Sequence, residues 1–246
     1  LLDALAVGFA DDGWSVKRLI RRIVLSRAYQ LDSRTDARCA EADPDNALVW
    51  RMSPRRLDAE ALRDSMLAAS GLLNLTPPVG SAVARSGEGP SARPRLLGDD
   101  LAQAVNDPRN NNRSVYLPVV RDNLPEALEL FDGADPSLVV SERPTTTVPA
   151  QGLFLLNSPF ALRVADAAAD RVMAGTTADS ERVRAAYQLA YARTPTDAEL
   201  LTATRFVEQY RTTTRGGRPA RPGADRDTWA ALMQALLASA EFQYRR

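Results

Sequence analysis

Residues suited to chemistry gather between Asn106 and Asn157, where the polar positions do not follow the spacing of a helix. Arginine guanidinium groups there could clamp carboxylate, sulfate or phosphate oxygens. Two aspartates could act as an acid/base pair or bind calcium, and neutral amides and hydroxyls suit the hydroxyl groups of a sugar. The candidate binding residues are Arg113, Arg121, Asp132, Asp135, Arg143, Thr146, Gln151 and Asn157, flanked by Thr145 and Thr147.

The same polar residues could instead hold irregular backbone in place. Arginines paired with Asp or Glu, and Thr or Asn side chains at helix ends, would satisfy backbone groups that no regular element satisfies. We favour this structural clasp over ligand binding, and ligand binding over catalysis. The arrangement of Arg113, Asp132, Arg143 and Gln151 distinguishes the alternatives, because a site requires them to converge on one accessible pocket.

Histidine is absent from the 246 residues, and Cys39 is the only cysteine. The chain therefore has no imidazole base, no His-based triad, no internal disulfide and no Cys/His zinc set. Cys39 lies in a polar run without a neighbouring base, so we interpret it as an incidental surface thiol. We expect no metal site and no cofactor held by this chain alone.

A short acidic run, Asp43-Pro44-Asp45-Asn46, places oxygen ligands close together, as calcium-binding loops do. It lacks the glycine and the distal glutamate of an EF-hand. A turn closed by Asp or Asn side chains, leading to Trp50, is the favoured interpretation.

Charge gives no general indication of a partner, because Lys+Arg and Asp+Glu both number 31. We expect no nucleic-acid binding, and no apolar run reaches the ~20 residues of a membrane span. One local exception is the predicted helix at 16–28, which has Lys17, Arg18, Arg21 and Arg22 opposite its apolar face. That cationic face is either solvated or a docking surface for an acidic partner.

Apolar residues recur at helical spacing in most of the chain, which predicts a mainly α fold: an irregular multi-helix domain with long loops and at most a short strand or hairpin. We expect one domain over 1–246, cut from a longer protein because it opens in mid-helix. The best strand candidate is 113–120. Long loops are expected at about 76–112 and 212–226, and helices at 55–70, 124–131, 149–156, 159–175, 179–191, 196–210 and 229–242.

Several short strings occur in an order that resembles the DUF1553 (PSD1 C-terminal) domain of multidomain proteins abundant in Planctomycetes and related bacteria. The resemblance covers almost the whole chain. Its strings include Gly13-Trp14-Ser15-Val16-Lys17, Asp43-Pro44-Asp45-Asn46, Arg55-Arg56-Leu57-Asp58-Ala59-Glu60, Arg113-Ser114-Val115-Tyr116, Phe131-Asp132, Glu142-Arg143-Pro144-Thr145-Thr146-Thr147, Gln151-Gly152-Leu153-Phe154-Leu155-Leu156-Asn157, Arg193-Thr194-Pro195-Thr196 and Glu241-Phe242.

The resemblance implies an exported parent protein, periplasmic or at the cell surface. Relatives commonly carry a cytochrome-c-like domain with haem c and a DUF1549 domain before this one, so those domains are the expected partners. A glycan is a further possible partner.

No reaction follows from the resemblance, and whether the chain is an enzyme stays open. The first hypothesis is a structural or ligand-binding module connected with polysaccharide processing. The second is a hydrolase or lyase half-site using Asp132 or Asp135, completed by a neighbouring domain. The third is a protein-docking helical platform.

Overall fold

The computed structural model describes residues 1–80, 106–119, 124–139, 141–215 and 223–245. The chain divides into two compact units, Leu1–Arg56 with Tyr244–Arg246, and Leu57–Gln243. Each unit is described by itself. The predicted mainly α fold is confirmed: the only strands among the described residues form one two-stranded antiparallel pair, β1 with β2.

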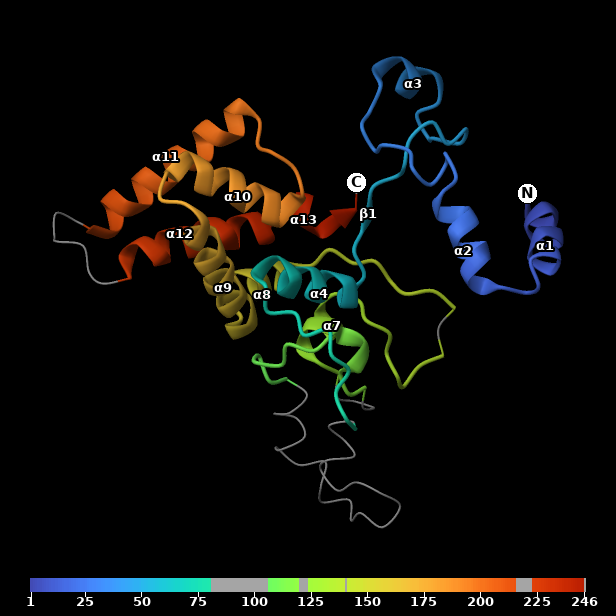
Figure 1. Cartoon of the computed structure of the whole chain (residues 1–246), viewed down its shortest axis with the longest axis horizontal. Coiled ribbons are helices and arrows are strands. Elements are labelled where there is room, and N and C mark those ends of the chain that lie inside the picture. Colours follow the sequence, from blue (N-terminus) through green and yellow to red (C-terminus); the bar gives the residue numbers. More distant parts are fainter. Residues whose placement is uncertain (81–105, 120–123, 140, 216–222, 246) are drawn as a thin grey trace, which may run out of the picture. The chain divides into compact units, whose positions relative to one another are not determined.

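The smaller unit contains three short helices and the strand pair (Figure 1). Their bounds are α1 (Leu2–Asp11), α2 (Val16–Val24), α3 (Ala37–Ala42), β1 (Arg55–Arg56) and β2 (Tyr244–Arg245). Ser15 accepts a hydrogen bond from the Arg18 amide and caps α2, as expected for a serine at this position. Asp36 caps α3 in the same way through the Cys39 amide.

The acidic run before Trp50 forms the predicted turn. Asp43 accepts hydrogen bonds from the amides of Ala47 and Leu48, at 2.9 and 2.8 Å. Asn46 accepts from the amides of Trp50 and Arg51. These side chains bond to the backbone of their own loop, as expected for an Asx-type turn.

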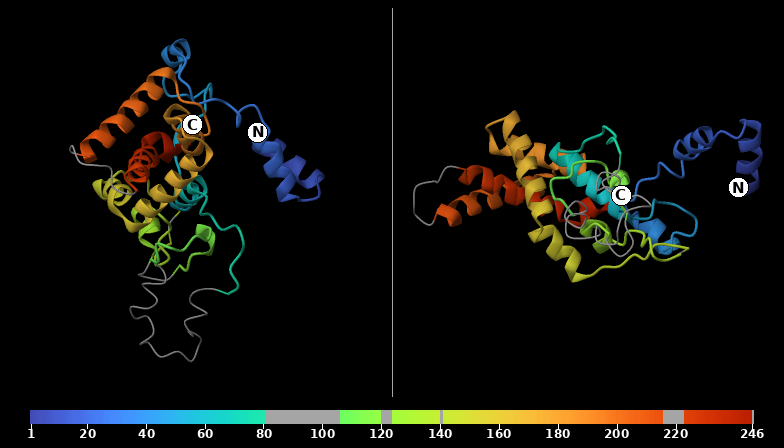
Figure 2. Two further views of the ribbon diagram at one scale, coloured as in Figure 1. Left: turned by 60° about the vertical axis from the view of Figure 1, so that its left-hand side comes forward. Right: turned by 90° about the horizontal axis from the view of Figure 1, so that it is seen from below.

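The larger unit is a helical assembly around two apolar clusters (Figures 1 and 2). Its helices are α4 (Ala59–Ser70), the 3-10 turn η2 (Ser114–Tyr116), α7 (Glu126–Leu130), α8 (Pro149–Asn157), α9 (Pro159–Gly175), α10 (Asp179–Tyr191), α11 (Asp197–Arg215), α12 (Ala224–Leu237) and α13 (Ala240–Gln243).

Helix α9 belongs to both clusters and packs against α4, α8, α10 and α12. Its first turns join the cluster shared with α4, α7 and α8. Later turns join the second cluster with α10, α11 and α12, around the fully buried Trp229. Small residues such as Ala168 and Ala169 allow this long helix to be covered on more than one side.

Several helix ends carry side chains typical of caps. Ser158 caps α9, with Pro159 in its first turn. Thr196 and Glu199 form a capping box at the start of α11, each side chain bonding to the amide of the other residue. Gly71 ends α4 at φ +76°, a conformation that glycine adopts without strain.

Two predicted elements require correction. The helix expected at 55–70 begins only at Ala59, because Arg55–Arg56 pairs with Tyr244–Arg245 as a strand. The predicted strand at 113–120 is wrong in its described part. Ser114–Tyr116 is a 3-10 turn, and Leu117 to Val119 is unpaired, including Pro118, which has no amide to donate.

The predicted long loops are only partly within the described residues. Residues 81–105, which make up most of the loop expected at about 76–112, lie outside them. The predicted loop 212–226 is helical at both ends, because α11 continues to Arg215 and α12 begins at Ala224. No helix in the described part of the chain combines the length and apolar character needed to cross a bilayer.

Candidate functional site

Three of the predicted site residues meet beside the start of α8. Asp132 accepts hydrogen bonds from the Thr146 amide and hydroxyl, both at 2.8 Å. The buried Gln151 donates to the carbonyl oxygens of Leu130 at 2.8 Å and Thr146 at 3.2 Å. These bonds connect the end of α7, the segment before α8 and the first turn of α8.

The backbone at the end of α7 explains why Asp132 is followed by glycine. Asp132 has φ +62°, a left-handed conformation that aspartate tolerates better than most residues. A Cβ atom on Gly133 would lie 2.7 Å from the carbonyl oxygen of Leu128, so the close turn excludes any side chain there. The turn directs the Asp132 carboxylate towards Thr146.

The predicted arginines lie against α4 rather than beside the aspartates. Arg143 makes two bonds to the Glu60 carboxylate, at 2.7 and 3.0 Å, and this contact lowers the pKa of Glu60. Arg113 is half-exposed, with its Nε 3.9 Å from an Asp64 oxygen. Glu60 and Asp64 are one turn apart on α4, so the two arginines approach neighbouring but separate carboxylates.

The other candidates bond within their own segments. The Asp135 carboxylate accepts from the Ser137 amide at 2.7 Å, and the Asn157 side chain donates to the Leu153 carbonyl within α8 at 3.1 Å. Arg121 lies outside the described residues. The candidates therefore do not meet in one group, and the binding role predicted for them stays a prediction.

Arg63 is a polar residue that was not among the candidates predicted from the sequence. It lies on α4 and is buried at 6% exposure. Its guanidinium donates to the carbonyl oxygens of Asn110 and Asn112 and to the Ser114 hydroxyl.

The position of Arg63 within α4 could have predicted this burial from the sequence. Arg63 lies four residues after Ala59 and four before Leu67, and both are almost fully buried. Residues spaced by four share a helix face. Burial lowers the pKa of Arg63 to about 10, so the guanidinium still carries its charge at neutral pH.

Asp64 completes the attachment of the 110–114 segment to α4. It accepts hydrogen bonds from the Ser114 amide and hydroxyl, both at 2.7 Å. Arg63 thus donates hydrogen bonds to oxygen acceptors of the 110–114 segment, and Asp64 accepts hydrogen bonds from donors of the same segment. Together, Arg63 and Asp64 hold in place the segment that forms one wall of the pocket described next.

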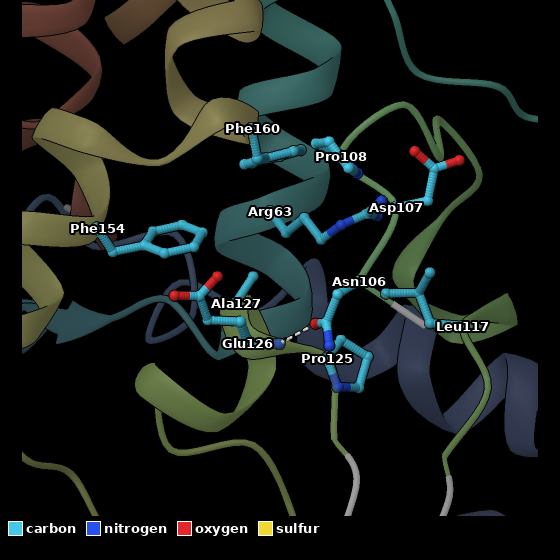
Figure 3. A pocket seen from close by; sticks show the side chains of 10 residues that line it. All are labelled: Arg63, Asn106, Asp107, Pro108, Leu117, Pro125, Glu126, Ala127, Phe154 and Phe160. Atoms are coloured by element: carbon cyan, nitrogen blue, oxygen red, sulfur yellow. Dashed lines mark hydrogen bonds between the residues drawn. The ribbon is translucent and has the colours of Figure 1, made fainter. Parts of the chain in front are cut away.

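A pocket opens beside Arg63, between α4, the start of α7, the α8–α9 region and the 106–117 segment (Figure 3). Its enclosed volume is only about 40 Å³, and its mouth is open to solvent. It is therefore much smaller than the ~300–1,000 Å³ pockets that enclose small ligands. The lining residues are Arg63, Asn106, Asp107, Pro108, Leu117, Pro125, Glu126, Ala127, Phe154 and Phe160.

The pocket combines an apolar interior with polar groups. The rings of Phe154 and Phe160 stack with centroids 6.3 Å apart, and the Arg63 guanidinium lies 5.4 Å from the Phe160 centroid. Asn106 accepts a hydrogen bond from the Glu126 amide at 2.8 Å, the dashed contact in Figure 3. The exposed Glu126 carboxylate has no bonding partner among the described residues.

This set of groups has the features of a ligand-binding site. Apolar faces cover the carbon skeleton of a ligand, while a few placed polar groups orient it. Within the described residues, no group of three or more Asp, Glu, His or Cys side chains could hold a metal ion. None of the seven sequence candidates that the structure describes lines the pocket.

Cys39 is half-buried on α3, and burial, with the Asp36 carboxylate adding to it, raises the pKa of its thiol. A raised thiol pKa disfavours the nucleophilic thiolate. The geometry agrees with the interpretation of Cys39 as an incidental residue.

Comparison with known families matches residues 1–207 to the model described as PSD1, protein of unknown function (DUF1553). No curated protein and no solved structure was found to match the chain. Because the match covers well over half of the sequence, the chain belongs to the PSD1 (DUF1553) family.

Proposed function

We propose that this PSD1-family chain is a non-catalytic binding module, and that the shallow, open pocket beside Arg63 contacts one edge of a sugar unit of a neutral polysaccharide. One observation carries the proposal: the pocket joins the Phe154–Phe160 interior to the Asn106, Asp107 and Glu126 side chains. A sugar ring has the same division, with apolar C–H faces and hydroxyl groups at its edge. Carboxylates accept hydrogen bonds from hydroxyl groups, whereas they repel anionic sugars.

The contacts of the aspartates argue against the hydrolase half-site. Both Asp132 oxygens accept hydrogen bonds from Thr146, and Asp135 bonds to the Ser137 amide. Neither aspartate lines the pocket. In this proposal Asp132, Thr146, Gln151 and Arg143 form a structural clasp that holds the segment between α7 and α8.

The setting follows from the family resemblance. We infer an exported parent protein in which haem c belongs to a separate cytochrome-c-like domain and a DUF1549 domain is a neighbour. In that setting the module would hold a glycan close to domains that carry other functions, and this chain itself would bind no cofactor.

Titration calorimetry of the purified chain against neutral and sulfated oligosaccharides tests the proposal. The site variant is Glu126→Ala and its matched control is Glu129→Ala, an exposed residue of the same short helix outside the pocket. We expect a neutral oligosaccharide to bind, and Glu126→Ala to weaken it at least about 10-fold, equivalent to ~1.4 kcal/mol. Both variants should melt at the wild-type temperature.

Three results would contradict the proposal. The first is the absence of binding to every neutral oligosaccharide in the panel. The second is equal weakening by Glu126→Ala and Glu129→Ala, which would place the ligand elsewhere. The third is preferential binding of the sulfated series, which would show that positive charge, not the Asp107 and Glu126 carboxylates, selects the ligand.

A further inference from the structure

Helices α1 and α2 form a hairpin whose geometry is fixed by its own contacts (Figure 1). Arg22 bonds to the Asp12 carboxylate at 3.0 Å, and Arg18 donates to the Asp12 carbonyl at 3.1 Å. The rings of Phe9 and Trp14 meet edge-to-face, with centroids 5.3 Å apart. These contacts hold α1 and α2 in one orientation relative to each other, so the outer side chains of the hairpin form a defined surface.

Gly8 allows the two helices to approach. A Cβ atom at this position would lie 1.9 Å from an Arg22 guanidinium nitrogen. The arginine thus lies directly over the backbone of α1 while it reaches Asp12. This contact orients α2 and leaves its apolar side facing away from the arginine.

Within residues 1–56, no other side chain covers the apolar side of α2. Val16, Ile20 and Ile23 are spaced by four and three residues, so they lie on one face, and they are 60%, 53% and 39% exposed. Trp14, just before the helix, is 72% exposed. Within residues 1–56, all of which the structure describes, no hydrophobic side chain is buried. A contiguous apolar row of this kind usually marks an interaction surface.

Charge indicates what would cover this row. Helix α2 carries four cationic residues in nine positions and no acidic residue. Arg22 pairs with the Asp12 carboxylate and Arg18 donates to the Asp12 backbone carbonyl. Lys17 and Arg21 make neither contact and have no carboxylate partner among the described residues. An occupant with an apolar stripe bordered by carboxylates would complement both features.

We propose that α2 docks an acidic amphipathic helix of a partner protein. The row from Val16 to Ile23 has the i, i+4, i+7 spacing by which one helix anchors in another's apolar surface. Over seven residues it extends about 10 Å, enough for two turns of a partner helix. Lys17 and Arg21 would meet Glu or Asp side chains beside the partner's apolar stripe.

A lipid surface fits the hairpin less well. Anionic membranes attract a segment through its summed charge, at ~1 kcal/mol per Lys or Arg. Residues 1–25 combine the four cations of α2 with Asp3, Asp11 and Asp12, so their side chains are close to neutral overall. A partner helix that contacts α2 meets Lys17 and Arg21, which have no carboxylate partner among the described residues, whereas Asp12 stays bonded to Arg22.

The test uses the full chain and a fluorescently labelled synthetic helix with Leu in an i, i+4, i+7 pattern and Glu elsewhere. A scrambled Leu/Glu peptide and a Leu/Lys peptide of the same pattern are the controls, with anisotropy as the readout. We expect the Leu/Glu helix to bind, with an affinity that falls as salt screens the charges. Ile20→Gln should weaken binding at least about 10-fold, equivalent to ~1.4 kcal/mol.

Charge reversal gives the sharpest comparison. Lys17→Glu combined with Arg21→Glu should make the Leu/Lys peptide the better ligand. Matched controls in the same unit are Leu48→Gln, at an 83% exposed apolar residue, and Arg38→Glu on α3; both should bind as wild type.

Four results would overturn the proposal. These are no binding of the Leu/Glu helix, equal binding of the scrambled peptide, binding to phosphatidylglycerol vesicles but not to the peptide, and self-association in sedimentation that blocks the peptide.

Discussion

Replacing Arg63 with methionine should detach the 110–114 segment from α4. Methionine keeps much of the length and apolar stem of the arginine but donates no hydrogen bonds. The change removes three bonds, to Asn110, Asn112 and Ser114, and leaves their acceptors near a buried position.

The magnitude follows from burial and charge. Hydrogen bonds to charged groups contribute ~1.5–3 kcal/mol each, but removing the guanidinium also removes its desolvation penalty. That penalty is large here, because burial lowers the pKa of Arg63 to about 10. We therefore expect a net loss of ~3–4 kcal/mol in the free energy of unfolding. For a unit of this size the melting temperature should fall by roughly 8–12 °C.

Differential scanning calorimetry and hydrogen exchange measure the two parts of this prediction. The matched control is Arg113→Met, since Arg113 is 49% exposed and 3.9 Å from the same Asp64. It should cost less than ~0.5 kcal/mol. In Arg63→Met the amides of 110–114 should exchange faster than those of α9. A melting temperature within 2 °C of wild type, or unchanged exchange at 110–114, would refute the anchoring role.

Two further predictions concern ion pairs of different exposure. Arg143→Ala should cost only about 1 kcal/mol in calorimetry, because Arg143 and Glu60 are each more than one-third exposed; a loss above ~3 kcal/mol would contradict this. Glu199 bonds to Arg193, which lowers the pKa of Glu199 to about 2. Its stabilisation should be complete above pH ~4.5 and disappear as pH falls towards 2. The shift corresponds to about 3 kcal/mol, and with 31% of the side chain exposed we expect ~1–2 kcal/mol. Glu199→Gln should flatten the acid unfolding curve between those pH values, and an unchanged curve would contradict the assignment.

Helices were predictable where the signal lies within one segment. The cap at Ser15, the stop at Gly71 and the box of Thr196 with Glu199 depend on bonds spanning a few residues. The Asp43 turn is local for the same reason. In each case the side chain and the backbone group that it satisfies lie within about one turn, so spacing in the sequence is also spacing in space.

Partners far apart in the chain were not predictable in this way. Arg143 bonds to Glu60 across 83 residues, and Arg63 reaches Asn112 across 49. The sequence of a helix does not show whether the side chain of an arginine or glutamate contacts water or another segment of the chain. The strand at Arg55–Arg56 likewise forms only because the other end of the chain returns to pair with it.

The sequence by itself therefore determined the helical class, the family and most helix ends, because periodicity and capping are short-range properties. Tertiary structure decided which polar residues are buried, which meet and where a pocket opens. The pocket brings Arg63, Asn106, Glu126 and Phe160 together from separate segments. The physical reason is that burial and electrostatic pairing depend on distances in space, and chain order sets those distances only within a turn or two.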